Sequence, residues 1–347
     1  MKIPRSDVVS GSALRLHYNE NTGGCSPAVV AAIREIDERQ IASYPDVVPS
    51  TEACARHLGI APEYVHLTNG LDEGIQVVTS WARQNSGSRA PHMLVPEPTF
   101  EMYGEFAAMA GGQLTRLEPL EDFRFPLEDL LERISTETRA IFLTDPNNPT
   151  GLGVPAGAAE TLAEAAQDAL VLVDEAYADF SGRTLIGPLL DRRKNVVIGR
   201  TFAKGHGLAG LRIGAVVAHP DTIDQLERLL PPFNVNICAL RGLEAALGDV
   251  AYLERYVAET RRSRELVYAF CRRHGLKYWP SEANFVLVRF GPLTSSIIDG
   301  LQARGIVLRD RSYSPGCEGC IRLTAGVVAH TEVALAAMED VLASRAN

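Results

Sequence analysis

The spacing of short apolar runs in the middle of the chain most constrains its fold. Each run is rich in β-formers, is bounded by turn residues and alternates with a helical pattern, as buried strands do. The predicted strands are residues 92–95, 140–143, 170–173 and 195–198. The predicted helices between them, residues 126–134 and 155–168, each have a proline near the start. This alternation predicts a mostly parallel sheet with helices on both faces.

Polar segments follow three of the predicted strands. They are residues 145–151 (DPNNPTG), 174–177 (DEAY) and 201–204 (TFAK). Ligands of open parallel sheets bind beyond the carboxyl ends of the strands, so the three segments predict one site at that edge. Lys204 ends the third segment and is followed by a glycine-rich turn and then by Arg212.

These segments resemble those of the aspartate-aminotransferase-like superfamily of pyridoxal-phosphate (PLP) enzymes, fold type I. Within it the chain is most similar to the histidinol-phosphate aminotransferase group. Short motifs match by chance, but several in family order along nearly the whole chain are distinctive together. The further matching segments are 19–27 (NENTGGCSP), 43–46 (SYPD), 68–73 (TNGLDE), 96–103 (PEPTFEMY), 284–285 (NF), 309–312 (RDRS) and 321–324 (IRLT).

The resemblance implies an α/β fold: a large domain with a mostly parallel sheet of the seven-stranded type, and a smaller α+β domain. We expect residues 1–40 to form an N-terminal arm that joins the small domain, residues 41–240 the large PLP-binding domain, and residues 241–347 the small domain. The pattern after residue 240 predicts helices at 249–274, 293–304 and 331–344 and strands at 284–289 and 305–309.

The resemblance also implies the catalytic residues Lys204, Asp174 and Tyr177. Lys204 would form a Schiff base with PLP, and Asp174, at a strand end, would keep the pyridine nitrogen protonated. Asn148 and Tyr177 would hydrogen-bond the phenolic oxygen of the ring. We expect nearby Arg212 and a desolvated cleft to favour the neutral amine of Lys204. Each residue also has an ordinary interpretation: a lysine in a glycine turn, a capping aspartate, an Asn-Pro turn and a core tyrosine.

The cofactor phosphate is expected at the start of a helical run at residues 74–83, where backbone N–H groups can bind an anion. Thr201 offers a hydroxyl, and the Arg212 guanidinium offers paired donors. The predicted phosphate residues are Gly70, Leu71, Asp72, Thr201 and Arg212. The family usually has serine where this chain has Ala203, so we expect weaker cofactor retention or compensation by water.

The remaining candidates come from the resemblance. Tyr103 would stack on the cofactor ring, although a core tyrosine on a helix face is the plain alternative. Tyr44 would reach the cofactor phosphate of a neighbouring subunit, which implies a homodimer with shared active sites; the alternative is a turn tyrosine. Arg322 would bind the acid group of the substrate through two donors. The substrate mouth would be lined by arm residues Asn19, Glu20 and Asn21.

The implied reaction is transamination between an amino donor and a 2-oxo acid, with histidinol phosphate and 2-oxoglutarate as the leading pair. Two departures from the family pattern, Val327-Val328 and Gly205-His206-Gly207, leave the substrate open. The alternatives are an aminotransferase of an aromatic or other amino acid, a PLP-dependent decarboxylase or oxidase, and a cofactor-binding regulator. For the regulator, the chain shows no added DNA-binding segment. We expect His206 to be structural.

Composition narrows the partners. A net charge of −9 argues against nucleic acid and anionic membranes. No apolar stretch approaches a membrane span, and the N-terminus lacks the apolar run of a signal peptide, which predicts a cytoplasmic location. The scattered cysteines do not suggest a disulfide framework. Cys317 and Cys320 form one close pair without further ligands at metal spacing, so we expect no metal.

Overall fold

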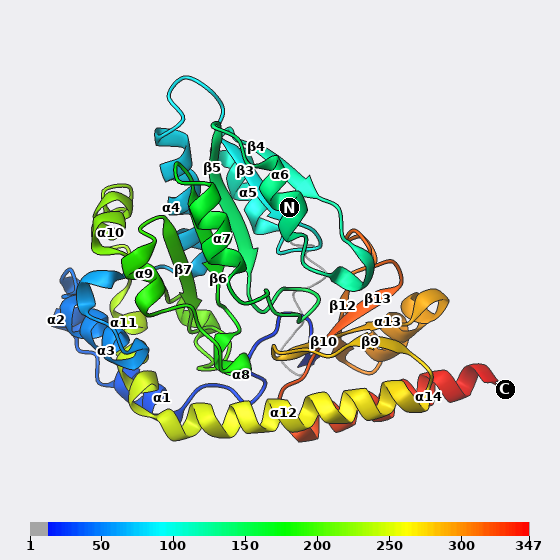
Figure 1. Ribbon diagram of the computed structural model, residues 1–347. Helices are drawn as coiled ribbons and strands as arrows, with labels where there is room; N and C mark the ends of the chain where they lie inside the picture. Colours follow the sequence, from blue (N-terminus) through cyan, green and yellow to red (C-terminus); the bar gives the residue numbers. More distant parts are fainter. Residues whose placement is uncertain (1–12, 347) are drawn as a thin grey trace.

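A seven-stranded sheet is the central feature of the computed structural model, which describes residues 13–346 (Figure 1). Its order is β2 (Val65–Thr68), β8 (Gly214–Ala218), β7 (Val196–Thr201), β6 (Leu170–Asp174), β5 (Thr138–Thr144), β3 (His92–Pro96) and β4 (Gln113–Leu117). Only β8 runs antiparallel to its neighbours. The predicted mostly parallel, seven-stranded sheet is therefore confirmed, and all four predicted strands belong to it.

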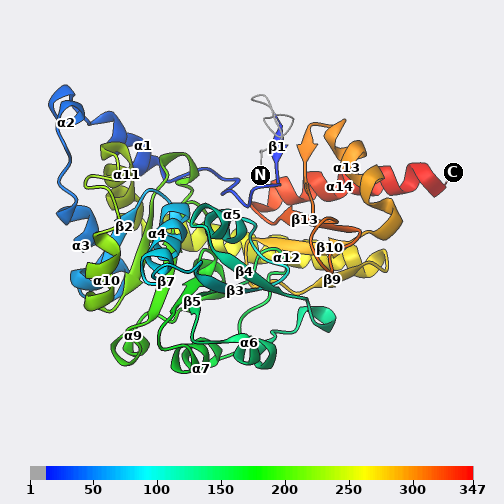
Figure 2. The same cartoon turned by 90° about the horizontal axis from the view of Figure 1, so that it is seen from above.

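Both faces of this sheet are covered. Alternate residues of β5 belong to different buried clusters: Ile141 and Leu143 to one, Ala140 and Phe142 to the other. Burial on two sides explains why such strands are continuously apolar. One face packs on α4 (Leu71–Gln84), α5 (Met102–Met109) and α10 (Pro220–Glu227). The other packs on α3 (Val48–Leu58), α6 (Leu127–Arg133), α7 (Ala158–Ala165), α9 (Pro188–Arg192) and α11 (Ile237–Gly248), as Figure 2 shows for α6, α7 and α9.

A smaller antiparallel sheet follows in the C-terminal part, which is α+β as predicted. Its order is β12 (Arg309–Asp310), β13 (Cys320–Thr324), β10 (Phe285–Arg289) and β9 (Lys277–Trp279). It shares a buried cluster with α12 (Val250–Arg273), α13 (Thr294–Gln302) and α14 (Val328–Ala346). The arm strand β1 (Leu14–Arg15) pairs with β11 (Ile306–Val307), so the start of the described chain lies beside this part. The domain limits stay a prediction.

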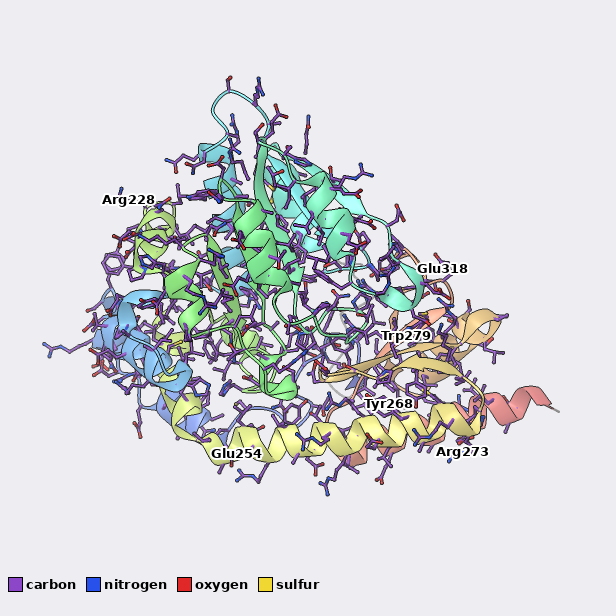
Figure 3. All side chains as sticks on the ribbon, in the orientation of Figure 1. Arg228, Glu254, Tyr268, Arg273, Trp279 and Glu318 are labelled. Carbon is purple, nitrogen blue, oxygen red and sulfur yellow. The ribbon has the colours of Figure 1, made fainter. Side chains whose placement is uncertain are left out.

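Helix α12 runs beneath both parts of the molecule (Figure 1). Glu254 and Arg273, labelled in Figure 3, lie toward its two ends. Near its start, Tyr256 packs on Phe180 of the large part, while Phe270 near its end joins the core of the small part. This continuous helix therefore fixes the two parts relative to each other.

The remaining helices are α1 (Pro27–Arg34), α2 (Glu38–Ala42), α8 (Ala178–Ser181) and the 3₁₀ turns at Pro62–Tyr64, Glu121–Phe123, Ala209–Leu211 and Gly291–Leu293.

The cysteines carry free thiols, and Cys317 and Cys320 are buried beside Trp279. Burial raises the pKa of the Cys317 thiol to about 12, so the thiol stays protonated. Within residues 13–346, no three His, Cys, Asp or Glu side chains group as metal ligands. Over the same range, no helix combines the length and apolar character that crossing a membrane requires.

Candidate active site

Lys204 lies in the turn after β7 and faces the N-terminal arm. Its Nζ donates to the carbonyl oxygen of Tyr18 at 3.0 Å. Burial, and then the charge of Arg322, lower the pKa of this amine to about 8. A substantial neutral fraction near neutral pH suits a nucleophile. The sequence predicted such a shift but named Arg212 as the cation. Arg322 acts instead, because the Arg212 guanidinium is paired with Asp72.

Asp174 is the last residue of β6 and is buried between the ends of β5 and β7. Its Oδ1 accepts the Ala176 backbone N–H at 2.9 Å, and its Oδ2 accepts the Tyr103 hydroxyl at 2.8 Å. Burial raises the pKa of this carboxyl to about 6, although both donors act against the shift. The next side chain, Glu175, is turned to Arg200 instead, as expected for adjacent residues of an extended segment.

The arm and the small sheet meet the loops of the large sheet at Asn148 and Tyr177. Arg322, on β13, donates through Nη1 to Asn148 Oδ1 and through Nη2 to the His17 carbonyl oxygen at 2.6 Å. Asn19 donates to the Tyr177 hydroxyl at 2.9 Å. Because the amide oxygen of Asn148 accepts from Arg322, the amide N–H groups of Asn148 can donate to a further ligand. Burial lowers the pKa of Arg322 to about 10, so its charge is retained at neutral pH.

A candidate anion site lies where α4 begins. Gly70 precedes the helix with φ +76°, and no side chain caps the first turn. Arg212 donates to Asp72 at 2.7 Å, and a Cβ on Gly70 would lie 2.7 Å from the same guanidinium nitrogen. The glycine therefore lets the Arg212 guanidinium approach the helix start. The guanidinium and the backbone N–H groups of Leu71 and Asp72 together favour binding of an anion there.

Thr201 ends β7 near this site. Its Oγ1 accepts the Ala203 backbone N–H at 3.2 Å, and Ala203 is itself buried. The hydroxyl that the family usually has at residue 203 is thus absent from the turn, as the sequence indicates. Thr68, at the end of β2, has a buried Oγ1 with no hydrogen-bond partner among the described residues.

Tyr103 is fully buried on α5. Its ring lies parallel to that of Phe142, with centroids 5.1 Å apart, and its hydroxyl is 2.7 Å from Thr144 Oγ1 as well as bonded to Asp174. This buried position agrees with the alternative given in the sequence analysis, a core tyrosine on a helix face. Its connection to the site is the hydroxyl group, and stacking on a cofactor ring stays a prediction.

The three arm residues differ in their contacts. Asn19 accepts at its carbonyl oxygen from Asn284, and Asn21 Nδ2 donates to the carbonyl oxygen of Gly205 at 2.8 Å. Glu20 pairs with Arg15 at 2.7 Å. Glu20 and Asn21 line an open pocket of about 670 Å³ that is also lined by Ala203 and Gly207 from the lysine turn. The arm therefore borders a pocket beside the lysine turn.

Tyr44 is not brought to the other candidates. It is 80% exposed and stacks on Phe233, with ring centroids 4.5 Å apart. It lines a surface groove with residues of α2, α3 and α11, none of them another predicted site residue. Its predicted role depends on a second subunit.

Sequence reasoning missed several polar residues close to the site. Arg311 is 1% exposed and binds Glu101, the Tyr313 hydroxyl and the Thr99 carbonyl oxygen. Its RDRS segment contributed to the resemblance without a role. Arg200 lies between the predicted strand and the segment at residues 201–204, and the sequence analysis gave it no role. No periodic signal could have found either residue, because their carboxylate partners lie on other elements. Glu101 is 210 residues from Arg311, and Glu175 and Asp179 are 25 and 21 residues from Arg200.

The residues around Lys204 fit the cofactor that the resemblance implies. A buried carboxylate can accept from a pyridinium N–H, a helix start with Arg212 suits a phosphate, and an amine of lowered pKa suits a covalent link to the cofactor. The buried Nε of Arg322 has no hydrogen-bond partner among the described residues and remains available to an anionic group.

Comparisons with known proteins agree with this geometry. The family model "Aminotransferase class I and II" matches residues 12–338. Histidinol-phosphate aminotransferases of Anoxybacillus flavithermus and Halalkalibacterium halodurans are 34% and 35% identical, over 96% of this chain and 90% of each relative. The structure of the Sinorhizobium meliloti histidinol-phosphate aminotransferase in complex with pyridoxal-5′-phosphate is 29% identical, with a TM-score of 0.85, and covers 96% of this chain and 91% of that one. The chain therefore belongs to the class I and II aminotransferase family and is an enzyme that transfers amino groups.

Proposed function

We propose that this aminotransferase moves the amino group of histidinol phosphate to 2-oxoglutarate. Pyridoxal 5′-phosphate is its cofactor. The relatives that match nearly the whole chain at 34% and 35% identity are histidinol-phosphate aminotransferases, which favours this donor. The observation that carries the proposal is the half-buried Lys204 amine, with its pKa of about 8, in the same site as a buried carboxylate and a buried guanidinium.

In this proposal each residue has one task. Bound PLP supplies an electron-withdrawing ring and a carbonyl that reacts with amines. Lys204 Nζ would form the covalent link to the cofactor, and its amine, once free again, would move a proton to and from the reacting carbon of the donor. Asp174 would accept the pyridine N–H, and Asn148 and Tyr177 would bond the phenolic oxygen. The cofactor phosphate would be held by Gly70, Leu71, Asp72, Thr201 and Arg212.

Arg322 and the arm would select the donor. Arg322 is buried, charged and directed at Asn148, so it can bind an acid group of the substrate close to the cofactor. Asn19, Glu20 and Asn21 would line the mouth of the site. Val327, one of the departures from the family pattern, donates its N–H to Thr22 of the arm at 2.9 Å. That departure thus lies at the arm contact rather than beside Lys204.

The donor is tested by adding amines singly to the PLP-loaded enzyme and following the loss of its visible absorption. We expect histidinol phosphate to react with a kcat/KM at least about 100-fold above that of histidinol, which lacks the phosphate, because charge-assisted bonds to a buried guanidinium are lost. Arg322→Met should remove most of this difference. Faster reaction with aromatic amino acids would contradict the donor assignment, and release of carbon dioxide without an acceptor would indicate a decarboxylase.

The proposal includes a homodimer in the cytoplasm with active sites completed by the partner's Tyr44. Its support is an apolar face on the N-terminal helices that a monomer would leave in water. Five of the large apolar side chains exposed among the described residues belong to this face: Val30, Ile41, Tyr44, Val48 and Phe233. Val30, Ile41 and Val48 lie on α1, α2 and α3, which gather at one side of the molecule (Figure 1), and Phe233 stacks on Tyr44.

Sedimentation velocity tests the dimer. The wild type should sediment at about twice the chain mass of 37.6 kDa. Ile41→Glu, at a side chain 69% exposed, should weaken association at least about 10-fold because a charge must be desolvated in the interface. The matched control is Met109→Glu, which is 71% exposed on α5 and should leave association unchanged. A wild type that stays monomeric at micromolar concentration would contradict the dimer.

A further inference from the structure

A buried ion-pair network lies directly behind the loop that carries Lys204. Arg200, on β7, places Nη1 3.2 Å from Glu175 Oε2 and Nη2 2.8 Å from Asp179 Oδ1. The three side chains are 7%, 2% and 8% exposed, respectively. Buried charges are expensive to desolvate and are retained only with close partners. None of the roles assigned above uses this network.

The network joins the two strand ends that carry the main candidates. Arg200 is the residue before Thr201, and Glu175 is the residue after Asp174. The Glu175 carboxylate is fully engaged: it also accepts from the Leu185 backbone N–H and from the Thr184 hydroxyl, each at 2.6 Å. One guanidinium therefore fixes the end of β6 against the end of β7 through a carboxylate that has little freedom to move.

Asp179 extends the network to the lysine turn. A Cβ on Gly205 would lie 2.7 Å from Asp179 Oδ2, so the carboxylate packs against the Cα of the residue next to Lys204. On its other side the turn is held by the arm: Asn21 donates to the Gly205 carbonyl oxygen, and a Cβ on Gly207 would lie 2.2 Å from the Gly24 carbonyl oxygen. The turn is thus enclosed between the network and the arm.

His206 completes the packing of this turn. It is 3% exposed, its ring lies 5.5 Å from those of His57 and Phe202, and burial lowers its pKa to about 4. A neutral, enclosed imidazole supports the structural role expected from the sequence. The departure from the family pattern at residues 205–207 accordingly lies where Asp179 and the arm leave little space.

We propose that Arg200 is a positioning residue for amino-group transfer: with Glu175 and Asp179 it sets the distance and angle between the Lys204 amine and the Asp174 carboxylate. The proposal rests on the roles given above to Lys204 and Asp174, which must act on one cofactor together. A guanidinium holds two carboxylates in a defined plane, which an ammonium cannot do. A misplacement of about 1 Å can slow a reaction on the order of 100-fold, so this geometry has a measurable consequence.

The test uses variants that separate positioning from folding. Arg200→Met alone would leave two buried carboxylates unpaired, so the main variant combines Arg200→Met, Glu175→Gln and Asp179→Asn and removes every charge of the network. Asp179→Asn alone is the milder variant, since it keeps the Arg200–Glu175 pair. The matched control is Arg192→Met with Glu160→Gln, an exposed pair whose closest nitrogen–oxygen distance is 3.3 Å. All are prepared as the PLP-loaded enzyme.

The readouts are kcat, KM for the donor, the pH midpoint of the visible absorption band, and the melting temperature. We expect the triple variant to fold and bind PLP. Its kcat should be at least about 10-fold lower, its KM should change less than about 3-fold, and its pH midpoint should move by at least about 0.5 unit. Binding of the donor is kept while the Lys204 amine and the Asp174 carboxylate are misoriented relative to each other. Asp179→Asn should shift the same quantities less, and the control none of them. Arg200→Lys should not restore kcat.

A folded triple variant with wild-type kcat and pH midpoint would overturn the proposal, whatever its melting temperature. If the triple variant does not fold, a wild-type kcat and pH midpoint for Asp179→Asn would overturn the proposal. The failure of the underlying roles looks different. If Lys204→Ala keeps the visible band, the assignment of Lys204 is wrong; if that band is lost while the network variants behave as wild type, only the positioning proposal fails.

Discussion

Replacing Lys204 by alanine should abolish the visible absorption of the PLP-loaded enzyme and lower kcat by at least about 10⁵-fold, since the covalent anchor and the proton carrier are lost together. Mass spectrometry after borohydride reduction checks the anchor. The chain has only four lysines: Lys2, Lys194, Lys204 and Lys277. A modified Lys204 resists trypsin, so the cofactor mass should appear on a peptide covering residues 201–212.

Lys194→Ala is the matched control for this result. Lys194 is exposed and pairs with Asp221 at 2.5 Å, so its loss should change neither the band nor kcat. Cofactor mass recovered on a peptide containing Lys194 or Lys277 instead would contradict the assignment of Lys204.

Asp174→Asn should lower kcat on the order of 10³-fold, because a neutral amide cannot hold the proton on the pyridine nitrogen through a charged bond. The same change should not lower the melting temperature of the cofactor-free protein at pH 7. The amide can still accept the Ala176 N–H through its oxygen and bond the Tyr103 hydroxyl through its nitrogen. Steady-state kinetics and thermal melting measure the two effects separately.

The pKa of Asp174 gives this prediction a pH dependence. The folded pKa of about 6 lies above the ordinary 3.8, so the folded state binds this proton more tightly than the unfolded one. The stabilisation is complete below pH 3.8 and is lost as the pH rises through 6, a change on the order of 3 kcal/mol in the free energy of unfolding. The cofactor-free variant should lack this decline. The control is Asp191→Asn, which changes an exposed carboxylate and should keep the decline in stability. A wild type whose stability does not decline over this pH range would contradict the raised pKa of Asp174.

The strands that the sequence failed to predict show where local patterns lose information. β4 (Gln113–Leu117) lies at the sheet edge and is polar on part of its length, and β2 (Val65–Thr68) is only four residues long. Neither has the uninterrupted apolar run that made the central strands recognisable. The antiparallel direction of β8 likewise has no signature in its own residues, because it depends on the partner strands.

In the site, too, local sequence indicates some features and misses others. The resemblance named Lys204 and Asp174, and local sequence places both near the ends of recognisable strands, at one edge of the sheet. The cation acting on Lys204 was predicted wrongly as Arg212, since a charge 118 residues further along can lie closer in space. Tyr103 was predicted as a residue of the site, but its hydroxyl bond to Asp174 spans 71 residues and has no local pattern.

The sequence alone indicated the class of fold and the edge of the sheet at which the candidate site lies, because β-propensity, two-sided burial and strand-end turns are properties of a few adjacent residues. The roles of individual residues toward PLP came from the resemblance to the aminotransferase superfamily. Only the tertiary structure decided that Arg322 meets Asn148 across 174 residues, that Asn19 reaches Tyr177 across 158, and that Arg200 joins Glu175 and Asp179 behind the lysine turn. These contacts depend on how separate elements pack, and packing is settled by the whole buried core rather than by any one segment.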